Sequence, residues 1–180
     1  FGPTSCPKFD VPRMKTLKTT LLAMVLLFTV ASCSKNEEVL VEEANYSVDL
    51  NLARETDWEM ANEVLAVINE HRRSIGRAPI KRDQQYASAF AVEHTKYMIN
   101  KKVINHDNFA ARSRGLKDRG AQAVAENVAM GYTTAENVVN AWLNSPAHRD
   151  VIEGNYTHSG FGIIMDDNGN YYYTQLFYRK

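Results

Sequence analysis

The C-terminal part of the chain carries an alternating pattern that limits the possible folds more than any other feature. Phe161, Ile163 and Met165 recur at every second position, and residues 171–178 are rich in aromatic and β-favouring side chains. Between these segments lies Asp-Asp-Asn-Gly-Asn (residues 166–170), which is typical of a hairpin turn. The sequence therefore predicts two antiparallel strands joined by a tight turn.

The upstream half of the chain follows a helical period instead. Thr56 and Glu59 have the spacing of a capping box, with Thr56 as the expected N-cap of a helix that ends near Gly76. Asp83 is the expected cap of a second helix, which ends near Lys101. The first helix has an apolar stripe at positions one turn apart, formed by Trp58, Ala61, Val64, Leu65 and Ile68.

The segments between the second helix and the hairpin are less regular. A short helix is expected over residues 109–114, and residues 123–130 are compatible with a strand or a tight loop. A second capping box at residues 133–136 starts a further helix. Ser145-Pro146 stops that helix and can start another short one. Helices first and antiparallel strands last predict an α+β fold.

Charge and cysteine content exclude several classes of protein. Lys plus Arg and Asp plus Glu each number 21 in the 180 residues, so the formal net charge is zero and no overall basic field is available to hold nucleic acid. Hydrophobic residues make up 44% of the chain, which argues for a globular domain and against a disordered one. Cys6 and Cys33 both lie near the N-terminus, so the folded part must be stable without disulfides.

The N-terminal region is typical of a bacterial export signal. Lys15 and Lys18 precede an apolar run from Leu21 to Ala31, which at ~1.5 Å per residue is too short to cross a hydrocarbon core about 30 Å thick. Small residues then lead to Cys33, as in a bacterial lipobox, where the cysteine is lipidated and becomes the new N-terminus. A plain secretory signal with a chance cysteine is the alternative.

Lipidation at Cys33 would attach the protein to a membrane of the bacterial cell envelope. The charged run after Cys33 resembles signals that direct some lipoproteins to the outer-membrane surface. The predicted organisation is an over-extended gene start or cloning remnant (residues 1–13), a lipoprotein signal peptide (14–32), an acidic tether (33–55) and a folded domain (56–180).

Three polar residues in irregular segments are the candidates for chemistry. His106 follows the second helix, Glu126 precedes Asn127, and His148 follows Ser145-Pro146. Two imidazoles and a carboxylate can hold Zn²⁺ with an open position, or they can act as an acid–base pair. Phosphate-binding loops, dinucleotide fingerprints, HExxH and GxSxG motifs are absent from the sequence.

Other conspicuous residues have structural explanations. His94 lies on the apolar stripe of the second helix and is expected to be a core histidine with one hydrogen bond. His71 is expected to be a capping or surface residue at a helix end, and His158 to belong to a turn. Tyr172 lies on the opposite strand face from its two neighbouring tyrosines, where it either packs or lines a cleft.

Several segments, taken in order and spacing, form a recognisable set that spans roughly residues 58–180. They are Asn69-Glu70-His71-Arg72 with Gly76, His106-Asp107-Asn108-Phe109 with Arg112, Ala125-Glu126-Asn127, Trp142-Leu143-Asn144-Ser145-Pro146-Ala147-His148-Arg149, Gly160-Phe161-Gly162 and Tyr173-Thr174-Gln175-Leu176-Phe177. This set resembles the CAP superfamily, also called SCP/PR-1-like, in its bacterial form.

The resemblance implies an α-β-α sandwich with a C-terminal β-hairpin and an exposed central cleft. In this family His and Glu residues line the cleft and can bind a divalent cation such as Zn²⁺. By position, His106, Glu126 and His148 match members of this set, with His106 and His148 as the expected metal ligands. Asn127 is expected to fix Glu126 by hydrogen bonding, and both Asn127 and Tyr172 are expected to contact a ligand. Tyr172 stands where eukaryotic members carry a histidine, and a phenol is a poor zinc ligand at neutral pH.

The sequence leaves three functions open. The leading one is an envelope-anchored domain that binds a small molecule, lipid, glycan or divalent metal in its cleft, because the His/Glu cluster has no evident nucleophile. The second is a hydrolase of envelope or extracellular substrates, in which His106 and His148 position water or a metal and Glu126 is the general base. The third is a structural or partner-binding module.

Overall fold

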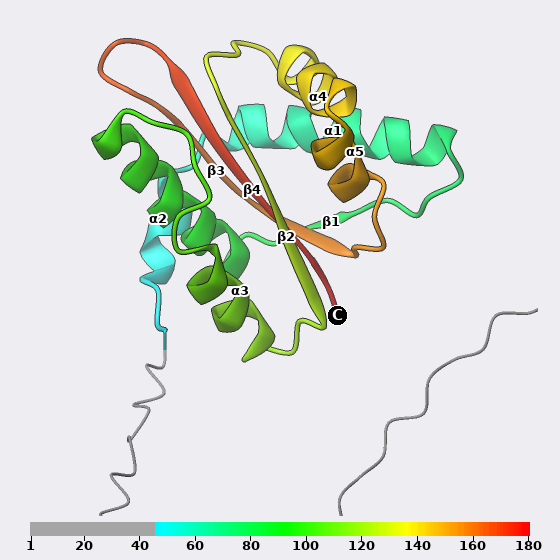
Figure 1. Cartoon of the computed structure of the whole chain (residues 1–180), viewed down its shortest axis with the longest axis horizontal. Helices are drawn as coiled ribbons and strands as arrows, with labels where there is room; N and C mark the ends of the chain where they lie inside the picture. The colour runs from blue at the N-terminus through cyan, green and yellow to red at the C-terminus, as the bar shows by residue number, and fades with distance from the viewer. Residues whose placement is uncertain (1–45) are drawn as a thin grey trace, which may run out of the picture. The chain divides into compact units, whose positions relative to one another are not determined.

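A four-stranded sheet runs through the domain, and helices cover both of its faces (Figure 1). The computed structural model describes residues 46–180, so the predicted leader, signal peptide, Cys33 and the first part of the tether lie outside the described residues. The strand order is β1-β3-β4-β2, so β1 and β2 form the two edges. The strands are β1 (Lys81–Arg82), β2 (Ala123–Met130), β3 (His158–Met165) and β4 (Tyr171–Arg179).

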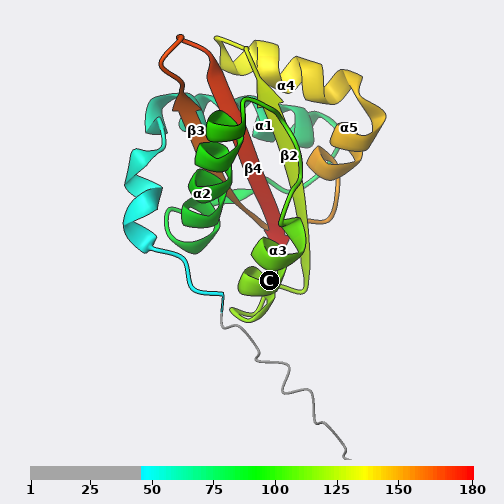
Figure 2. The ribbon, with the colours of Figure 1, turned by 60° about the vertical axis from the view of Figure 1, so that its left-hand side comes forward.

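The helices divide between the two faces of the sheet, which confirms the expected α-β-α sandwich (Figures 1 and 2). A short 3₁₀ helix, η1 (Leu50–Glu55), contacts α2. None of the helices in residues 46–180 is long and apolar enough to span a bilayer. One face carries α1 (Trp58–Ser74), α4 (Ala135–Asn144) and α5 (Pro146–Ile152), and the other carries α2 (Tyr86–Lys101) and α3 (Phe109–Lys117).

The predicted C-terminal hairpin is confirmed by the pairing of β3 with β4, which are antiparallel. The side chain of Asp166 accepts hydrogen bonds from the backbone N–H groups of Asn168 and Asn170, which closes the turn. Gly169 has φ +83°, a conformation that glycine adopts without a steric penalty. β2 pairs with the other side of β4, so the segment that was compatible with a strand or a loop is a strand.

The first helix begins one residue later than predicted. Asp57 is the N-cap, and its side chain accepts a hydrogen bond from Met60 N–H at 3.0 Å. The hydroxyl of Thr56 instead donates to the carbonyl oxygen of Phe161 at 2.6 Å. Thr56 therefore joins the start of the helix to β3, and a contact distant in sequence has replaced the predicted local cap.

Two other predicted caps are also displaced. Thr134, not Thr133, caps α4 by accepting a hydrogen bond from Asn137 N–H at 3.2 Å. Asp83 accepts from the N–H of Gln85, which is the residue that precedes α2. The break at Ser145-Pro146 is confirmed, with Pro146 at the first position of α5.

The hydrophobic core lies within one compact unit, Glu42–Lys180. The largest cluster fills the space between the sheet and α1, α4 and α5, and two smaller clusters lie under α2 and α3. Because every cluster is built from residues of this unit, we expect residues 42–180 to fold on their own.

Glycines in β3 allow α2 to approach the sheet closely. A Cβ atom at Gly162 would overlap the backbone of Ala91, and one at Gly160 would overlap the backbone between Ala87 and Ser88. The close contact brings the hydroxyl of Thr95, on α2, within 2.8 Å of both the Gly162 carbonyl oxygen and the Thr174 hydroxyl.

We predict that Gly162→Ala lowers the free energy of unfolding by about 1–3 kcal/mol or more, because the added methyl meets helix backbone and not a flexible side chain. Denaturant unfolding of residues 42–180 measures this change in the free energy of unfolding. Gly131→Ala is the control, since its Cβ meets no atom within 4 Å and its cost is limited to the positive φ. A Gly162→Ala domain as stable as the unchanged one would contradict this packing.

Candidate functional site

A buried carboxylate on the edge strand β2 is the centre of the site. The side chain of Glu126 is 1% exposed and faces α2 and α3. Arg112, on α3, is 3% exposed and donates from Nε to Oε2 and from Nη2 to Oε1, both at 2.8 Å. This two-pronged ion pair supplies the partner that a buried charge requires.

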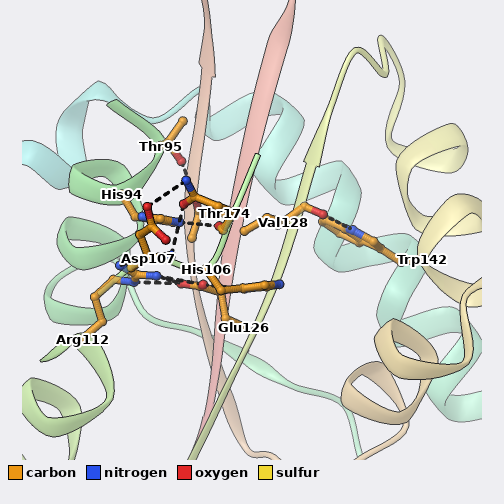
Figure 3. A network of polar contacts seen from close by, with 10 residues as sticks. His94, Thr95, His106, Asp107, Arg112, Glu126, Val128, Trp142 and Thr174 are labelled. Carbon is orange, nitrogen blue, oxygen red and sulfur yellow. Dashed lines mark hydrogen bonds and ion pairs between the residues drawn. The ribbon is translucent and has the colours of Figure 1, made fainter. Parts of the chain in front are cut away.

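His106 completes the set of hydrogen bonds to Glu126 (Figure 3). Its Nδ1 lies 2.8 Å from Glu126 Oε1, and its side chain is 52% exposed. An ionised carboxylate only accepts hydrogen bonds, so Nδ1 must carry the proton. In the neutral imidazole Nε2 is therefore the acceptor, and Glu126 is the only hydrogen-bond partner of this ring among the described residues.

The surroundings of Glu126 keep it ionised. Burial alone would raise its pKa, but the hydrogen bonds from His106 and Arg112 and the charge of Arg112 outweigh burial and hold the pKa below its ordinary value. Its oxygens are already engaged and its proton affinity is low, so Glu126 is poorly suited to act as a general base. In this geometry the base is His106, with Glu126 as the group that orients it.

The loop that carries His106 is held from two sides. Arg112 Nη1 donates to the carbonyl oxygen of Asp107 at 2.6 Å, and His94 Nε2 lies 2.8 Å from the carbonyl oxygen of Asn105. The carboxylate of Asp107 also accepts from Tyr97 Oη at 2.8 Å. These contacts fix the backbone on both sides of His106.

The prediction that His94 is a core histidine is confirmed, because it is buried and makes one hydrogen bond. Burial, followed by the charge of Arg112, lowers its pKa, so the ring is neutral near pH 7. Since a carbonyl oxygen only accepts, Nε2 carries the proton and donates to Asn105. His94 thus positions the loop before His106, a role that the sequence did not reveal.

His148 lies in the first turn of α5, which packs on the opposite face of the sheet from α2 and α3. Burial lowers its pKa, and the charge of His106 lowers it further. His148 is neutral near pH 7 and offers one donor and one acceptor.

Asn127 acts differently from the prediction. Neighbouring residues of a strand point to opposite faces, so the fully buried Asn127 points away from Glu126. Its Nδ2 donates to the backbone carbonyl oxygen of His148 at 3.2 Å. Asn127 therefore fixes His148 and not Glu126, and β2 carries supports for both imidazoles.

Of the two expectations for Tyr172, packing or lining a cleft, the structure shows packing. It is 4% exposed and forms a core cluster with Met98 and Val128 under α2. The predicted face is right, because its neighbours Tyr171 and Tyr173 pack with the cluster on the other side of the sheet. Sequence alternation predicted which face of the sheet Tyr172 lies on, but not that α2 covers it almost completely.

The donor set does not fit the expected zinc site. The described residues contain no group of three or more His, Cys, Asp or Glu side chains placed to hold a metal ion. The carboxylate expected to complete such a site, Glu126, already has both oxygens bound to Arg112. A cation at Glu126 would have to displace a buried guanidinium, so the arrangement favours the acid–base alternative.

The side chain of His106 is about half exposed, so this part of the site is reached from solvent. A small cavity of about 170 Å³ adjoins Arg112 and His94, and larger cavities of about 360–480 Å³ lie elsewhere in the domain. The small cavity is lined by Tyr46, Glu93, His94, Tyr97, Asn108 and Arg112. None of these cavities is lined by His106 or His148.

The family assignment follows from the sequence model of the CAP family, described as the cysteine-rich secretory protein family, which matches residues 65–177. The chain belongs to the CAP family. The match contains all three candidate residues, His106, Glu126 and His148.

Solved structures with the same fold come from other bacterial proteins. An outer surface protein of Borrelia burgdorferi has a TM-score of 0.61 at 22% identity, over 68% of this chain and 93% of its own. An extracellular protein of Bacillus anthracis that contains an SCP domain has a TM-score of 0.55 at 26% identity, over 66% of this chain and 40% of its own.

Relatives from Bacillus subtilis cover less of their own length. YkwD is 29% identical over 106 residues, and the membrane protein YlbC is 30% identical over 125 residues. These alignments cover 56% and 66% of this chain but only 41% and 34% of the relatives. The chain thus matches less than half of either protein.

We predict that Glu126 makes stability depend on pH in the acid range. Its folded-state pKa lies below the ordinary value of 4.5, so its contribution is present above about pH 4.5 and is lost as pH falls through the folded-state pKa. Glu126→Gln should remove this dependence and lower the free energy of unfolding at pH 7 by roughly 3–5 kcal/mol, because Arg112 is left buried without a counter-charge.

Denaturant unfolding of residues 42–180 between pH 2 and pH 7 gives both quantities. Glu63→Gln, at an exposed position of α1, is the matched control and should leave both unchanged. An acid dependence that is equal in the Glu126→Gln and Glu63→Gln proteins would show that Glu126 is not held as described.

For Zn²⁺ we predict no tight one-to-one binding to residues 42–180 by calorimetry, because Arg112 occupies the carboxylate of Glu126. The His106→Ala/His148→Ala double variant should give the same weak response as the unchanged domain. Tight stoichiometric binding that the double variant loses would instead establish a metal centre.

Proposed function

We propose that the protein is an extracytoplasmic binding protein of the bacterial envelope, anchored by a lipid on Cys33, whose CAP domain recognises a hydroxyl-rich ligand through His106 and His148. The observation that carries the proposal is the pairing of an exposed imidazole with a buried, fully engaged carboxylate. Such a pairing fixes which ring nitrogen accepts a hydrogen bond from a ligand.

The envelope location is supported by the sequence and by the relatives. The N-terminal segment has the order of a lipoprotein signal, with basic residues, an apolar run and small residues before Cys33. Related structures come from an outer surface protein and an extracellular protein. An acidic tether after the cysteine would hold the domain away from the lipid surface.

The chemistry of the two imidazoles favours a neutral polar ligand such as an envelope glycan. In its neutral form His106 offers a fixed acceptor at Nε2, and the lowered pKa of His148 keeps its ring neutral near pH 7. A sugar carries adjacent hydroxyl groups that donate and accept hydrogen bonds, which such a pair can match. The side chain of His106 is about half exposed, so a ligand can reach it from solvent.

A hydrolase is the second candidate, favoured by the contact between His106 and Glu126. A carboxylate that orients an imidazole is the arrangement of a general base. Neither a Ser, Thr nor Cys side chain is hydrogen-bonded to His106 in residues 46–180, so the nucleophile in this mechanism is water. In this mechanism Nε2 of His106 would accept a proton from the attacking water.

The binding test uses soluble disaccharide-peptide fragments of peptidoglycan, titrated into residues 42–180 and followed by NMR. We expect saturable shifts at His106 and His148, and roughly a tenfold or greater loss of affinity in His106→Ala, equivalent to one strong hydrogen bond. His71→Ala is the control, because His71 pairs with Glu153 on another part of the surface. Product in the same samples would support the hydrolase.

If neither saturation nor product is seen, or if His71→Ala weakens binding as much as His106→Ala, glycan recognition at this site is wrong. Saturation with lipid vesicles in place of the fragments would redirect the proposal to a lipid ligand. Normal behaviour of His106→Ala cells under envelope stress would favour a structural module.

The anchor is tested separately on the full-length chain in a bacterial host. We expect incorporation of a labelled fatty acid and recovery in the membrane fraction. Cys33→Ser should abolish the label and release the protein, because Cys33 is the predicted acceptor. Cys6→Ser should change neither. Label that persists in Cys33→Ser would contradict the lipid anchor.

A further inference from the structure

A second candidate site lies away from His106, where the end of α1 meets the strands β1 and β3. A cavity of about 480 Å³ opens there between the loop that follows α1 and the loop that precedes β3. No Asp or Glu side chain is among its lining residues. Its polar lining includes Arg72, Arg77, Lys81, Asn155, Thr157 and His158.

Arg72 forms the buried wall of this cavity. It is 2% exposed, and its guanidinium donates to the carbonyl oxygens of Ala78, Ile152 and Gly154 at 2.9, 2.5 and 2.9 Å. These partners are neutral, so they satisfy the N–H groups without cancelling the charge. Burial, followed by the charge of Arg77, lowers the pKa of Arg72, as expected for a cation beside another cation.

Two exposed cations continue the cavity wall. Neither Arg77 nor Lys81 takes part in an ion pair within residues 46–180. Of the acidic side chains nearby, Glu153 pairs with His71 at 2.8 Å, and Asp83, which accepts from Tyr178 Oη at 2.8 Å, keeps its charge but does not line the cavity. The lining of the cavity therefore has no Asp or Glu side chain to neutralise these cations.

The pKa of His158 is affected by burial and by the cations around the cavity. Its pKa is lowered by burial, then by the charges of Lys180 and Lys81, while Asp83 acts in the opposite sense. The pKa of Arg72 and that of His158 are thus both lowered first by burial and then by cations that line the same cavity. A mobile anion that entered the cavity would relieve this repulsion.

We propose that this basic cavity binds a phosphate-bearing ligand. Arg77 presents a planar guanidinium fork and Lys81 a compact ammonium group, which are the two side chains that bind phosphate oxygens most strongly. The side chain of Asn155 adds a neutral donor. The cavity has room for a phosphate together with the group that carries it. A soluble phosphorylated compound and a phospholipid headgroup share this chemistry.

The test titrates pyrophosphate into residues 42–180 with ¹⁵N-labelled histidines. We expect saturable binding and a rise in the pKa of His158, because a bound anion stabilises the imidazolium. Arg77→Gln/Lys81→Gln should weaken binding by about tenfold or more, since two charge-assisted contacts are lost. Both side chains are exposed, so the variant should fold.

Arg114→Gln/Lys117→Gln is the matched control, which removes the same charge from exposed positions of α3. It should bind like the unchanged domain. If both double variants bind pyrophosphate equally weakly, the loss of affinity is due to overall charge, and the proposal is overturned. Absence of saturation, or an unchanged His158 pKa at saturation, would overturn it as well.

Sedimentation with phosphatidylglycerol-containing vesicles distinguishes the two sources of phosphate. Recruitment that Arg77→Gln/Lys81→Gln abolishes would assign a lipid headgroup. Pyrophosphate binding without vesicle recruitment would assign a soluble ligand. Both outcomes support the cavity chemistry, and neither depends on the glycan proposal, because His106 and His148 do not line this cavity.

Discussion

The buried ion pair between Arg112 and Glu126 is the interaction on which the candidate site depends. It joins α3 to the edge strand β2 at two hydrogen bonds of 2.8 Å, with both charges almost completely removed from solvent. Neither group is tolerable there without the other. Arg112 Nη1 also donates to the backbone carbonyl oxygen of Asp107. Arg112 therefore holds both the carboxylate that binds His106 and the loop that carries His106. A fixed imidazole at the surface follows from this pair.

The edge position of β2 explains how one short strand organises residues on both faces of the sheet. Alternation directs Glu126 to α3 and Asn127 to α5, and the two side chains then position His106 and His148. Trp142 strengthens the arrangement from α4, because its Nε1 donates to the backbone carbonyl oxygen of Val128 at 3.1 Å (Figure 3). An edge strand that is tied on one face by α3 and on the other by α4 and α5 is a rigid support for a surface site.

Much of the fold could be predicted because it depends on local patterns. The hairpin turn, the apolar stripe of α1 and the proline break before α5 each arise from neighbouring residues. The predicted cap of the first helix was wrong because a distant partner competed for it. The hydroxyl of Thr56 donates to the carbonyl oxygen of Phe161 and does not cap its own helix. For the site, Arg112 was visible in the His-Asp-x-Phe-x-x-Arg spacing, but its contact with Glu126 joins two elements that no local period relates. The burial of Tyr172 could not be predicted for a similar reason, because alternation does not reveal how deeply a helix covers a strand.

The tautomer of His106 tests the central claim most directly. Nitrogen NMR of residues 42–180, at a pH where the imidazole is neutral, distinguishes a proton on Nδ1 from one on Nε2. Since the carboxylate of Glu126 accepts from Nδ1, we predict a single tautomer with the proton on Nδ1, and a mixture in Glu126→Gln. A proton on Nε2, or the same mixture with and without the carboxylate, would contradict the account.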